Sequence, residues 1–286
     1  MIKSLALLII ITLCLLGCIG VSLAQDWQEL KGDHFLVYFT KDEKFAKEVL
    51  DKAEVYYDRI ASDLGYSRYS GFWTWDNRVK IYIYPDRNSY SKVSNVASWS
   101  EGMADYKNKR IISYAWGKGF LDSLLPHEMA HLIFRDFVGF KGEVPVWIDE
   151  GVAQWEEPFK REKVKTASKY LLTNSMLFSV TDMVNLDIRK VSENSKVSIH
   201  SICDKNGNRN FLSLNGNVVV NTYYIEAVSI VGFLIKHYGA DNFTNFCRQL
   251  RDGKSLEESL SFAYPTNIIT IEELENSWLE YLVQEE

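Results

Sequence analysis

The chain has 286 residues, of which 47% are hydrophobic and 24% charged, and this ordinary globular composition excludes a disordered chain, a collagen-like repeat and a polytopic membrane protein. Only 5 prolines and 16 glycines are present, so no linker rich in them divides a chain long enough for one large domain or two small ones. The formal net charge of −6 argues against a nucleic-acid partner, because no excess of positive charge is available to neutralise phosphates.

The first 24 residues have the pattern of an export signal. Residues 5–16 form an almost unbroken apolar run that is too short for a comfortable membrane span. Small residues at positions −3 and −1 favour cleavage before Gln25, whereas the preceding Leu-Leu-Gly-Cys segment resembles a lipobox in which Cys18 is lipidated. An uncleaved anchor is the third alternative. Each places the remainder outside the cytoplasm: periplasmic, extracellular or lipid-anchored at the cell envelope, with membrane contact only through this signal or Cys18.

Two cysteines, Cys203 and Cys247, remain after the signal. An oxidising compartment permits a disulfide between them. Two unrelated thiols are the alternative that the sequence leaves open.

The first part of the chain, up to about residue 120, is predicted to be mixed α/β with a small sheet. Strands are expected at 34–39, 79–84 and 110–114, where β-branched and aromatic residues gather. Apolar residues at helical spacing predict a helix over 42–64, which Gly65 ends. Four tryptophans flank these strands and are expected to pack in the core, with a substrate-side wall as the alternative: Trp73, Trp75, Trp99 and Trp116.

From residue 121 onward the pattern becomes helical. Three helices are expected first, over 121–137, 145–153 and 160–172. Asp122 or Ser123 is the expected N-cap of the first, which places Pro126 in its first turn, where a missing N–H costs little.

The C-terminal third predicts a hairpin followed by helices. Short β-like runs and turn signals over 194–220 indicate an inserted hairpin. A strong helix is expected over 223–238, closed by Gly239. Capping boxes that start at Ser255 and Thr270 predict two more helices.

One segment carries a recognisable chemical pattern, the His-Glu-x-x-His motif formed by His127, Glu128 and His131. Four residues of helix turn through about 400°, so the two imidazoles share one face and can meet one metal ion. Glu128 is then offset toward the rim, within reach of a metal-bound water. Two structural histidines without a metal are the simpler alternative.

A catalytic zinc site usually has three protein ligands and one water. Glu150 lies nineteen positions after His131, between Trp147 and Gly151 in the next expected helix. This spacing suits a helix, a loop and a returning helix that faces the first. Glu150 is therefore the candidate third ligand.

These residues resemble the gluzincin metallopeptidases, most closely the peptidase MA-like families related to the thermolysin and aminopeptidase N clans. The resemblance is clearest over residues 124–154 and weaker over 223–239. The first hundred residues match only in the order of expected elements, a strand, a long helix and a second strand. It implies an α+β fold in which a small mixed sheet precedes a mainly helical, thermolysin-like half. A single catalytic domain is then expected over 25–286.

The resemblance also implies roles for individual residues. One zinc ion would be held by three side chains: His127, His131 and Glu150. Glu128 would be the general base that activates the zinc-bound water, and Tyr224, with Tyr223 as second choice, would stabilise the oxyanion.

Two departures from the family pattern bear on the activity. Thermolysin-like enzymes tend to have an acidic residue four positions after the third ligand, as a partner for a ligating histidine, and here Gln154 stands there. Residues 101–105 only loosely resemble the aminopeptidase Gly-x-Met-Glu-Asn segment and lack its amine-holding glutamate. Internal cleavage is therefore favoured over aminopeptidase action.

The sequence predicts an exported zinc-dependent peptidase acting on a peptide or protein substrate. The alternatives are a catalytically inert zinc-binding or peptide-binding module of the cell envelope, and a metal-free binding domain. Two expectations concern the cleft. The strand at 110–114 is expected to offer its edge to an extended peptide, and the insertion at 194–220 to cover the cleft.

Overall fold

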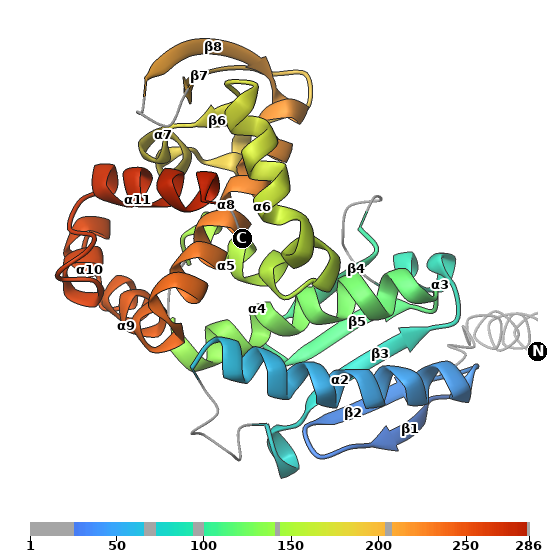
Figure 1. Cartoon of the computed structure of the whole chain (residues 1–286). Helices are drawn as coiled ribbons and strands as arrows, with labels where there is room; N and C mark the ends of the chain where they lie inside the picture. Colours follow the sequence, from blue (N-terminus) through green and yellow to red (C-terminus); the bar gives the residue numbers. More distant parts are fainter. Residues whose placement is uncertain (1–25, 66–72, 94–99, 141–143, 204–207, 285–286) are drawn as a thin grey trace, which may run out of the picture.

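A five-stranded β-sheet with helices on one face forms the first part of the chain, as Figure 1 shows for the computed structural model. The structure describes residues 26–65, 73–93, 100–140, 144–203 and 208–284. The predicted signal peptide, the cleavage site before Gln25 and the lipidation site at Cys18 therefore lie outside the described residues. In chain order the elements of this part are β1 (Gln28–Lys31), β2 (Phe35–Phe39), α2 (Glu43–Asp63), β3 (Val79–Tyr84), α3 (Arg87–Val93), β4 (Gly102–Asp105), β5 (Arg110–Tyr114) and α4 (Leu125–Val138).

The sheet has the strand order β1-β2-β3-β5-β4. Its three central strands are parallel, and β1 and β4 pair antiparallel at the two edges. The central strands confirm the three predicted strands. Alternate residues of β2 and β3 are buried, whereas β5 buries three consecutive residues, and α2 and α4 lie over the sheet. The predicted long helix is confirmed as α2, in which the Asp42 side chain accepts a hydrogen bond from Phe45 N. Gly65, at φ 76°, follows its end.

The strand at 110–114 is not an edge strand, so the expectation that it offers its backbone to a peptide is wrong. β4 turns back and pairs with β5, which leaves β4 as the edge of the sheet. The Asp105 side chain holds this turn, accepting hydrogen bonds from Asn108 N at 3.1 Å and Arg110 Nε at 2.9 Å. A four-residue strand is too short to show a clear alternation in the sequence.

α4 begins in a way that the sequence did not predict. A π-helical turn, Phe120–Leu124, leads into it, and Pro126 lies in its first turn as expected. Neither expected N-cap residue caps the helix. Asp122 instead pairs with Lys52, and Ser123 donates a hydrogen bond to Glu157.

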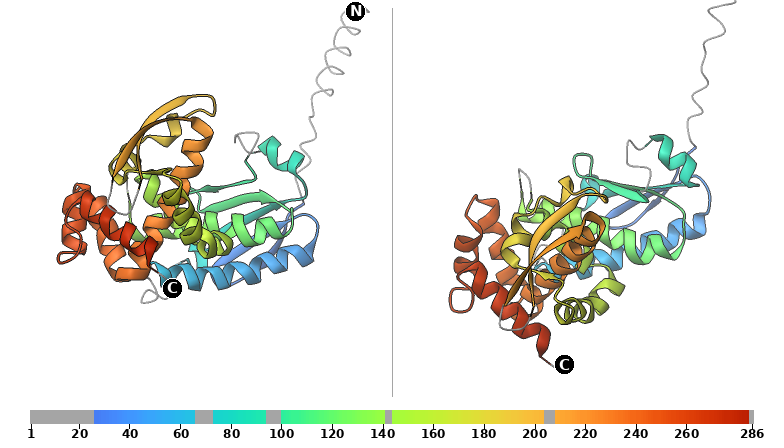
Figure 2. Two further views of the ribbon diagram at one scale, coloured as in Figure 1. Left: turned by 45° about the horizontal axis from the view of Figure 1, so that its top comes forward. Right: turned by 90° about the horizontal axis from the view of Figure 1, so that it is seen from above.

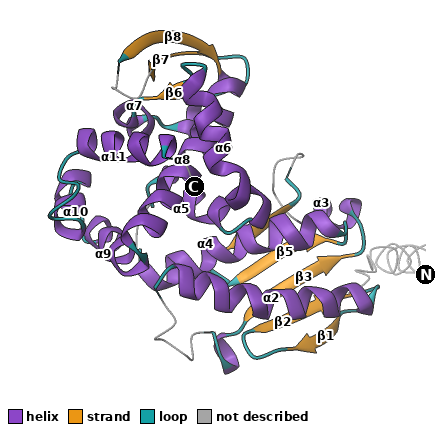
Figure 3. Ribbon diagram, viewed as in Figure 1, coloured by secondary structure: helices purple, strands orange, loops and turns teal. Residues whose placement is uncertain are grey.

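The second part of the chain is mainly helical, as the colours of Figure 3 make plain. Its elements are α5 (Val146–Trp155), α6 (Pro158–Thr173), β6 (Leu177–Phe178), α7 (Val180–Asn185), η3 (Ile188–Lys190), β7 (Lys196–Ile202), β8 (Arg209–Asn215), α8 (Gly216–Tyr238), α9 (Ala240–Arg251), α10 (Leu256–Ala263) and α11 (Ile271–Val283). Both predicted capping boxes are present, at the starts of α10 and α11. The mixed sheet and the helical part together confirm the α+β class.

α8 is the central helix of this part. It is long and apolar enough to cross a membrane, yet 72% of its most apolar window is buried by the surrounding elements. α5 packs closely against it. A Cβ at Gly151 would lie 2.7 Å from the Ala227 carbonyl oxygen, so a glycine is needed where the two helices meet. This close approach fixes α5, which carries Glu150.

β6, β7 and β8 form a second, antiparallel sheet, drawn at the top of Figure 1 and seen from two other sides in Figure 2. The predicted hairpin is confirmed within residues 196–215. Residues 216–220 already belong to α8, which starts at Gly216, about two turns earlier than the sequence predicts. A Cβ at Gly216 would lie 1.8 Å from the Ser192 carbonyl oxygen, so this glycine allows the helix to begin against the preceding loop.

The structure also bears on the alternatives for the cysteines (a disulfide or two unrelated thiols) and for the tryptophans (core packing or a wall on the substrate side). Cys203, just after β7, and Cys247, in α9, are free thiols, which agrees with two unrelated cysteines. Trp73 is buried and donates to Asp136 Oδ2 at 2.8 Å, as core packing requires. Trp75 is 81% exposed and Trp116 37%, so core packing is wrong for them, and Trp99 lies outside the described residues.

A buried carboxylate joins the two parts of the molecule. Glu156, just after α5, is completely buried, and its Oε2 accepts a hydrogen bond from Arg59 Nε of α2 at 3.2 Å. Its Oε1 has no partner among the described residues. Burial, together with the negative charge of Asp63, raises the pKa of Glu156 to about 7 despite the neighbouring guanidinium groups.

We expect the substitution Glu156→Gln to change the pH dependence of stability. The folded pKa is raised, so the proton on Glu156 stabilises the native state at acid pH, and this contribution is lost as pH rises through about 7. As the pH rises from 5 to 8, the free energy of unfolding of the natural protein should fall relative to that of the variant, by about 2–3 kcal/mol in total. Urea unfolding at several pH values measures this. Parallel curves for the two proteins would contradict it.

Candidate metal centre

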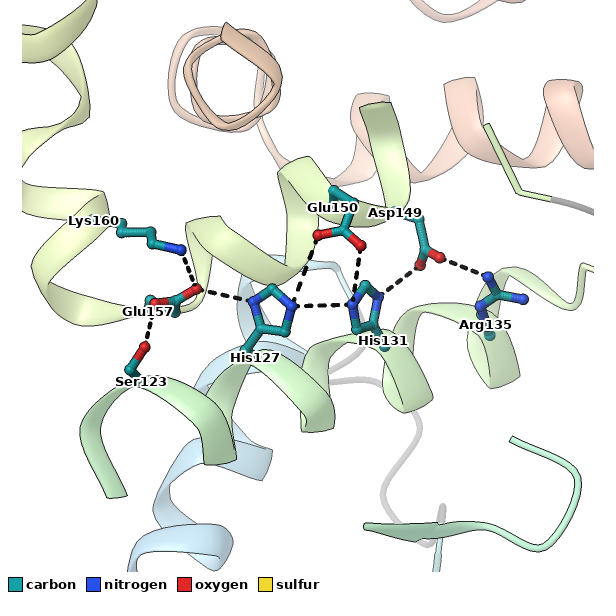
Figure 4. Close-up of polar contacts among 8 residues, drawn as sticks. All are labelled: Ser123, His127, His131, Arg135, Asp149, Glu150, Glu157 and Lys160. Atoms are coloured by element: carbon teal, nitrogen blue, oxygen red, sulfur yellow. Dashed lines mark hydrogen bonds and ion pairs between the residues drawn. The ribbon is translucent and has the colours of Figure 1, made fainter. Parts of the chain in front are cut away.

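Two histidines one turn apart on α4 face a glutamate of α5, as Figure 4 shows. The Nε2 atoms of His127 and His131 lie 3.2 Å apart. Glu150 Oε2 lies 3.8 Å from Nε2 of His127, and Glu150 Oε1 lies 3.8 Å from Nε2 of His131. One ligand atom from each of the three residues falls within 4.8 Å of the others. The structure thus brings together the three side chains that the sequence proposes as ligands.

A carboxylate holds the imidazole of His127 from behind. Its Nδ1 lies 2.9 Å from Glu157 Oε1, on the far side of the ring from Glu150. Glu157 is fixed in turn, because Ser123 Oγ donates to its Oε2 at 2.5 Å and Lys160 Nζ to its Oε1 at 2.8 Å. Although burial opposes it, the hydrogen bond from His127 helps to hold the pKa of Glu157 below its usual range.

A second carboxylate holds His131 in the same way. Its Nδ1 lies 3.0 Å from Asp149 Oδ1, and Arg135 Nη2 donates to Asp149 Oδ2 at 2.6 Å. The guanidinium of Arg135 also lies 4.1 Å from the ring centroid of Tyr106. Burial raises the pKa of Asp149, but His131 and Arg135 more than offset this and lower it. Figure 4 shows the two carboxylates flanking the pair of imidazoles along α4.

These two partners of the imidazoles, Glu157 and Asp149, were not predicted from the sequence. The family pattern places the partner of a ligating histidine four positions after Glu150, at Gln154, and this residue is buried in α5. Both Nδ1 atoms instead have carboxylate partners, Asp149 directly before Glu150 and Glu157 just beyond the helix end. The available signal was the presence of acidic residues in an otherwise apolar helix and just after its end. Spacing alone did not say which of them reaches an imidazole.

The donor chemistry fits a divalent cation. With each Nδ1–H donating to a carboxylate, the Nε2 atoms of the two neutral imidazoles point toward each other and can share one cation, which is a proton when no metal is bound and a metal ion when one displaces it. Two nitrogen ligands of a tetrahedral zinc lie about 3.3 Å apart, close to the observed 3.2 Å. Burial lowers the pKa of His131, but Asp149 and the other nearby carboxylates reverse this and raise it to about 9. The centre therefore attracts positive charge.

The general-base candidate lies beside this centre. Glu128 is half-buried on α4, and its charge is among those that raise the pKa of His131. The three ligand atoms that converge belong to His127, His131 and Glu150, and not to Glu128. Its position is consistent with a carboxylate next to the metal that does not bind it.

A cavity of about 430 Å³, here called the site cavity, opens beside the centre. Its lining residues are Tyr106, Arg135, Val144, Val146, Asp149, Glu150, Arg189 and Tyr224. Of the two candidate tyrosines, only Tyr224 is in this lining, whereas Tyr223 is buried and lines an adjoining cavity. Burial and the charge of Glu150 raise the pKa of Tyr224 to about 12, so its hydroxyl keeps its proton at neutral pH. Tyr106 and Arg189 were not anticipated from the sequence.

The expected cover of the cleft is not supported by the lining. The described residues that line the site cavity include Arg189 of η3 but none from β7 or β8. The short helical turn before the hairpin, and not the hairpin itself, contributes to the lining.

Comparisons with known proteins add no assignment. No protein-family model matches the chain, and no curated protein matches it. The interpretation of the site consequently rests on its geometry and its donor chemistry.

Proposed function

We propose that this protein is an exported zinc-dependent peptidase of the gluzincin type, cleaving internal peptide bonds. The observation that carries the proposal is the convergence of His127, His131 and Glu150, with each Nδ1 already held by a carboxylate. This arrangement leaves both Nε2 atoms ready for a metal, which is how catalytic zinc ligands are oriented.

Zinc held by these three side chains would supply Lewis acidity for the scissile carbonyl and lower the pKa of a bound water. In the proposed mechanism Glu128 accepts the proton of the attacking water and delivers it to the leaving amine. The Tyr224 hydroxyl donates a hydrogen bond to the developing oxyanion, a role consistent with its place in the site cavity.

Two features support internal cleavage. β4 is an antiparallel edge strand that contacts α4, and within the described residues no strand pairs with its other side, where an extended peptide would add. Glu101, at the start of the segment that resembles the aminopeptidase motif, is engaged by Tyr114 and lies 3.3 Å from Arg87 Nη2. It is thus occupied within the protein rather than held for a free amino terminus.

The test combines metal content with cleavage by the purified chain 25–286. We expect one zinc per chain and cleavage of an unfolded protein substrate, with activity lost on chelation and restored by zinc. The variant Glu150→Ala should lose both zinc and cleavage, whereas Glu162→Ala, on the exposed face of α6, should keep both. Zinc without cleavage would favour the inert envelope module, and the absence of zinc would overturn the site.

A further inference from the structure

Three cavities follow one another from the candidate metal centre to the β7–β8 hairpin. The site cavity shares Val144, Val146 and Arg189 with the adjoining cavity of about 350 Å³. The adjoining cavity in turn shares Asn185 and Leu186 with a third cavity of about 280 Å³, here called the hairpin cavity. The three hollows therefore form a path that begins beside the proposed zinc ligands and ends at the hairpin.

The hairpin cavity lies between α7 and the hairpin, which are drawn together at the top of Figure 1. Phe211 of β8 lines it and is 66% exposed, although burial of a phenylalanine side chain is favourable. The ring centroid of Phe211 lies 5.2 Å from that of His200, and the two rings are inclined at 58°. Leu186 and Val197 add aliphatic surface to the lining. The cavity thus offers an apolar wall that a partner's side chain would cover.

The His200 side of this wall is held in place by α7. The Nδ1 atom of His200 lies 2.9 Å from Asp182 Oδ2, and the same oxygen accepts a hydrogen bond from His200 N at 2.7 Å. The proposed hydrolysis uses neither residue. A wall that is ordered before a partner arrives lowers the entropic cost of binding.

Part of β7 has an open edge at this cavity. β6 is only two residues long and pairs with the last two residues of β7. The carbonyl of His200 accepts from Ser179 N and its N–H donates to Asp182, so this residue directs its backbone groups away from β8. Every second residue of an antiparallel pair does the same, and Ser198 is the next one. Within the described residues no strand pairs with Ser198 on this side, where the hairpin cavity lies.

We propose that the hairpin cavity is a second binding site for the polypeptide substrate, in which an extended segment adds to β7 beside Ser198 and places an apolar side chain against Phe211. This inference rests on the proposed peptidase function and names its substrate class, an unfolded polypeptide long enough to reach from the metal centre to the hairpin. The backbone of β7 would bind any extended segment, and Phe211 would add the preference for an apolar residue. The occupant is the substrate rather than a separate protein, because the hairpin cavity is continuous with the site cavity.

The test measures the binding of two peptides that share one central sequence, so that it does not depend on turnover. Zinc-loaded Glu128→Gln protein is titrated with a peptide of about 4 residues, which spans about 14 Å, and with one of about 12 residues, which spans about 40 Å. The long peptide carries apolar residues toward both ends. It should bind about 10- to 100-fold more tightly, because it alone reaches the hairpin cavity. In hydrogen exchange the long peptide, and not the short one, should slow exchange of the Ser198 amide.

Phe211→Ser, added to the same background, should weaken binding of the long peptide about 10-fold and leave the short peptide unaffected. Phe262→Ser is the matched control, because it makes the same change at a side chain that is 61% exposed on α10 and outside the linings of the three cavities. It should change neither affinity.

Equal affinities for the two lengths, or a length dependence that Phe211→Ser leaves intact, would overturn the inference. Length-dependent binding by a natural protein that cleaves neither peptide would instead overturn the proposed function and leave the binding site at the hairpin standing.

Discussion

The substitution Glu128→Gln is expected to reduce kcat for peptide cleavage by about 10²–10⁴-fold while the protein still binds one zinc. Glutamine keeps the size of the side chain but cannot accept a proton from water at neutral pH. Glu128 is not among the three ligand atoms that converge, so metal binding does not require its charge. Zinc content by elemental analysis and initial rates on an unfolded protein substrate measure the two quantities.

The matched control is Glu162→Gln, which makes the same chemical change at a side chain that is 69% exposed on α6. It should behave like the natural protein in both assays. Full cleavage by Glu128→Gln would show that another group activates the water. Loss of zinc from this variant would show that Glu128 is needed for the metal centre, and the proposed division of roles would be wrong.

The second large effect concerns the two carboxylates behind the imidazoles. Glu157→Gln and Asp149→Asn are each expected to weaken zinc binding about 10–100-fold. The amide oxygens can still accept from Nδ1, but they no longer carry the charge that fixes the tautomer and strengthens the opposite nitrogen as a ligand. Asp149→Asn also leaves Arg135 without its matching charge.

Competition for zinc with a coloured chelator measures the dissociation constants. Circular dichroism of the zinc-free proteins shows whether each variant is folded. Glu157→Asp serves as the conservative variant and should recover part of the affinity, because the charge is retained. Unchanged zinc affinity in both Glu157→Gln and Asp149→Asn would show that the imidazoles are positioned by packing alone.

Features that depend on local sequence are predictable here. Helical spacing placed His127 and His131 on one face of α4, since neighbours four apart share a face in any α-helix. The capping box at Ser255 marks the start of α10, because its hydrogen bonds join residues only three apart. The start of α8 was missed, because it depends on a contact between Gly216 and the distant Ser192 carbonyl.

Features that depend on which elements pair with each other were missed. The edge position of β4 follows from its pairing with β5, and four residues give too short a pattern to reveal it. Gln154 was examined because of its spacing from Glu150, but the chain beyond α5 turns so that Glu157 reaches His127 instead. No periodicity of the sequence encodes that turn.

The sequence by itself therefore determined the motif on α4, the third candidate ligand on the next helix and the α+β class, since these follow from spacing and periodicity within short segments. Only the tertiary structure decided which carboxylates orient the imidazoles, which strand forms the edge, and that Arg189 reaches the site cavity. The physical reason is that a hydrogen bond or an ion pair depends on distances between atoms. For residues far apart in the chain, those distances are fixed by how the helices pack, as where Gly151 lets α5 approach α8.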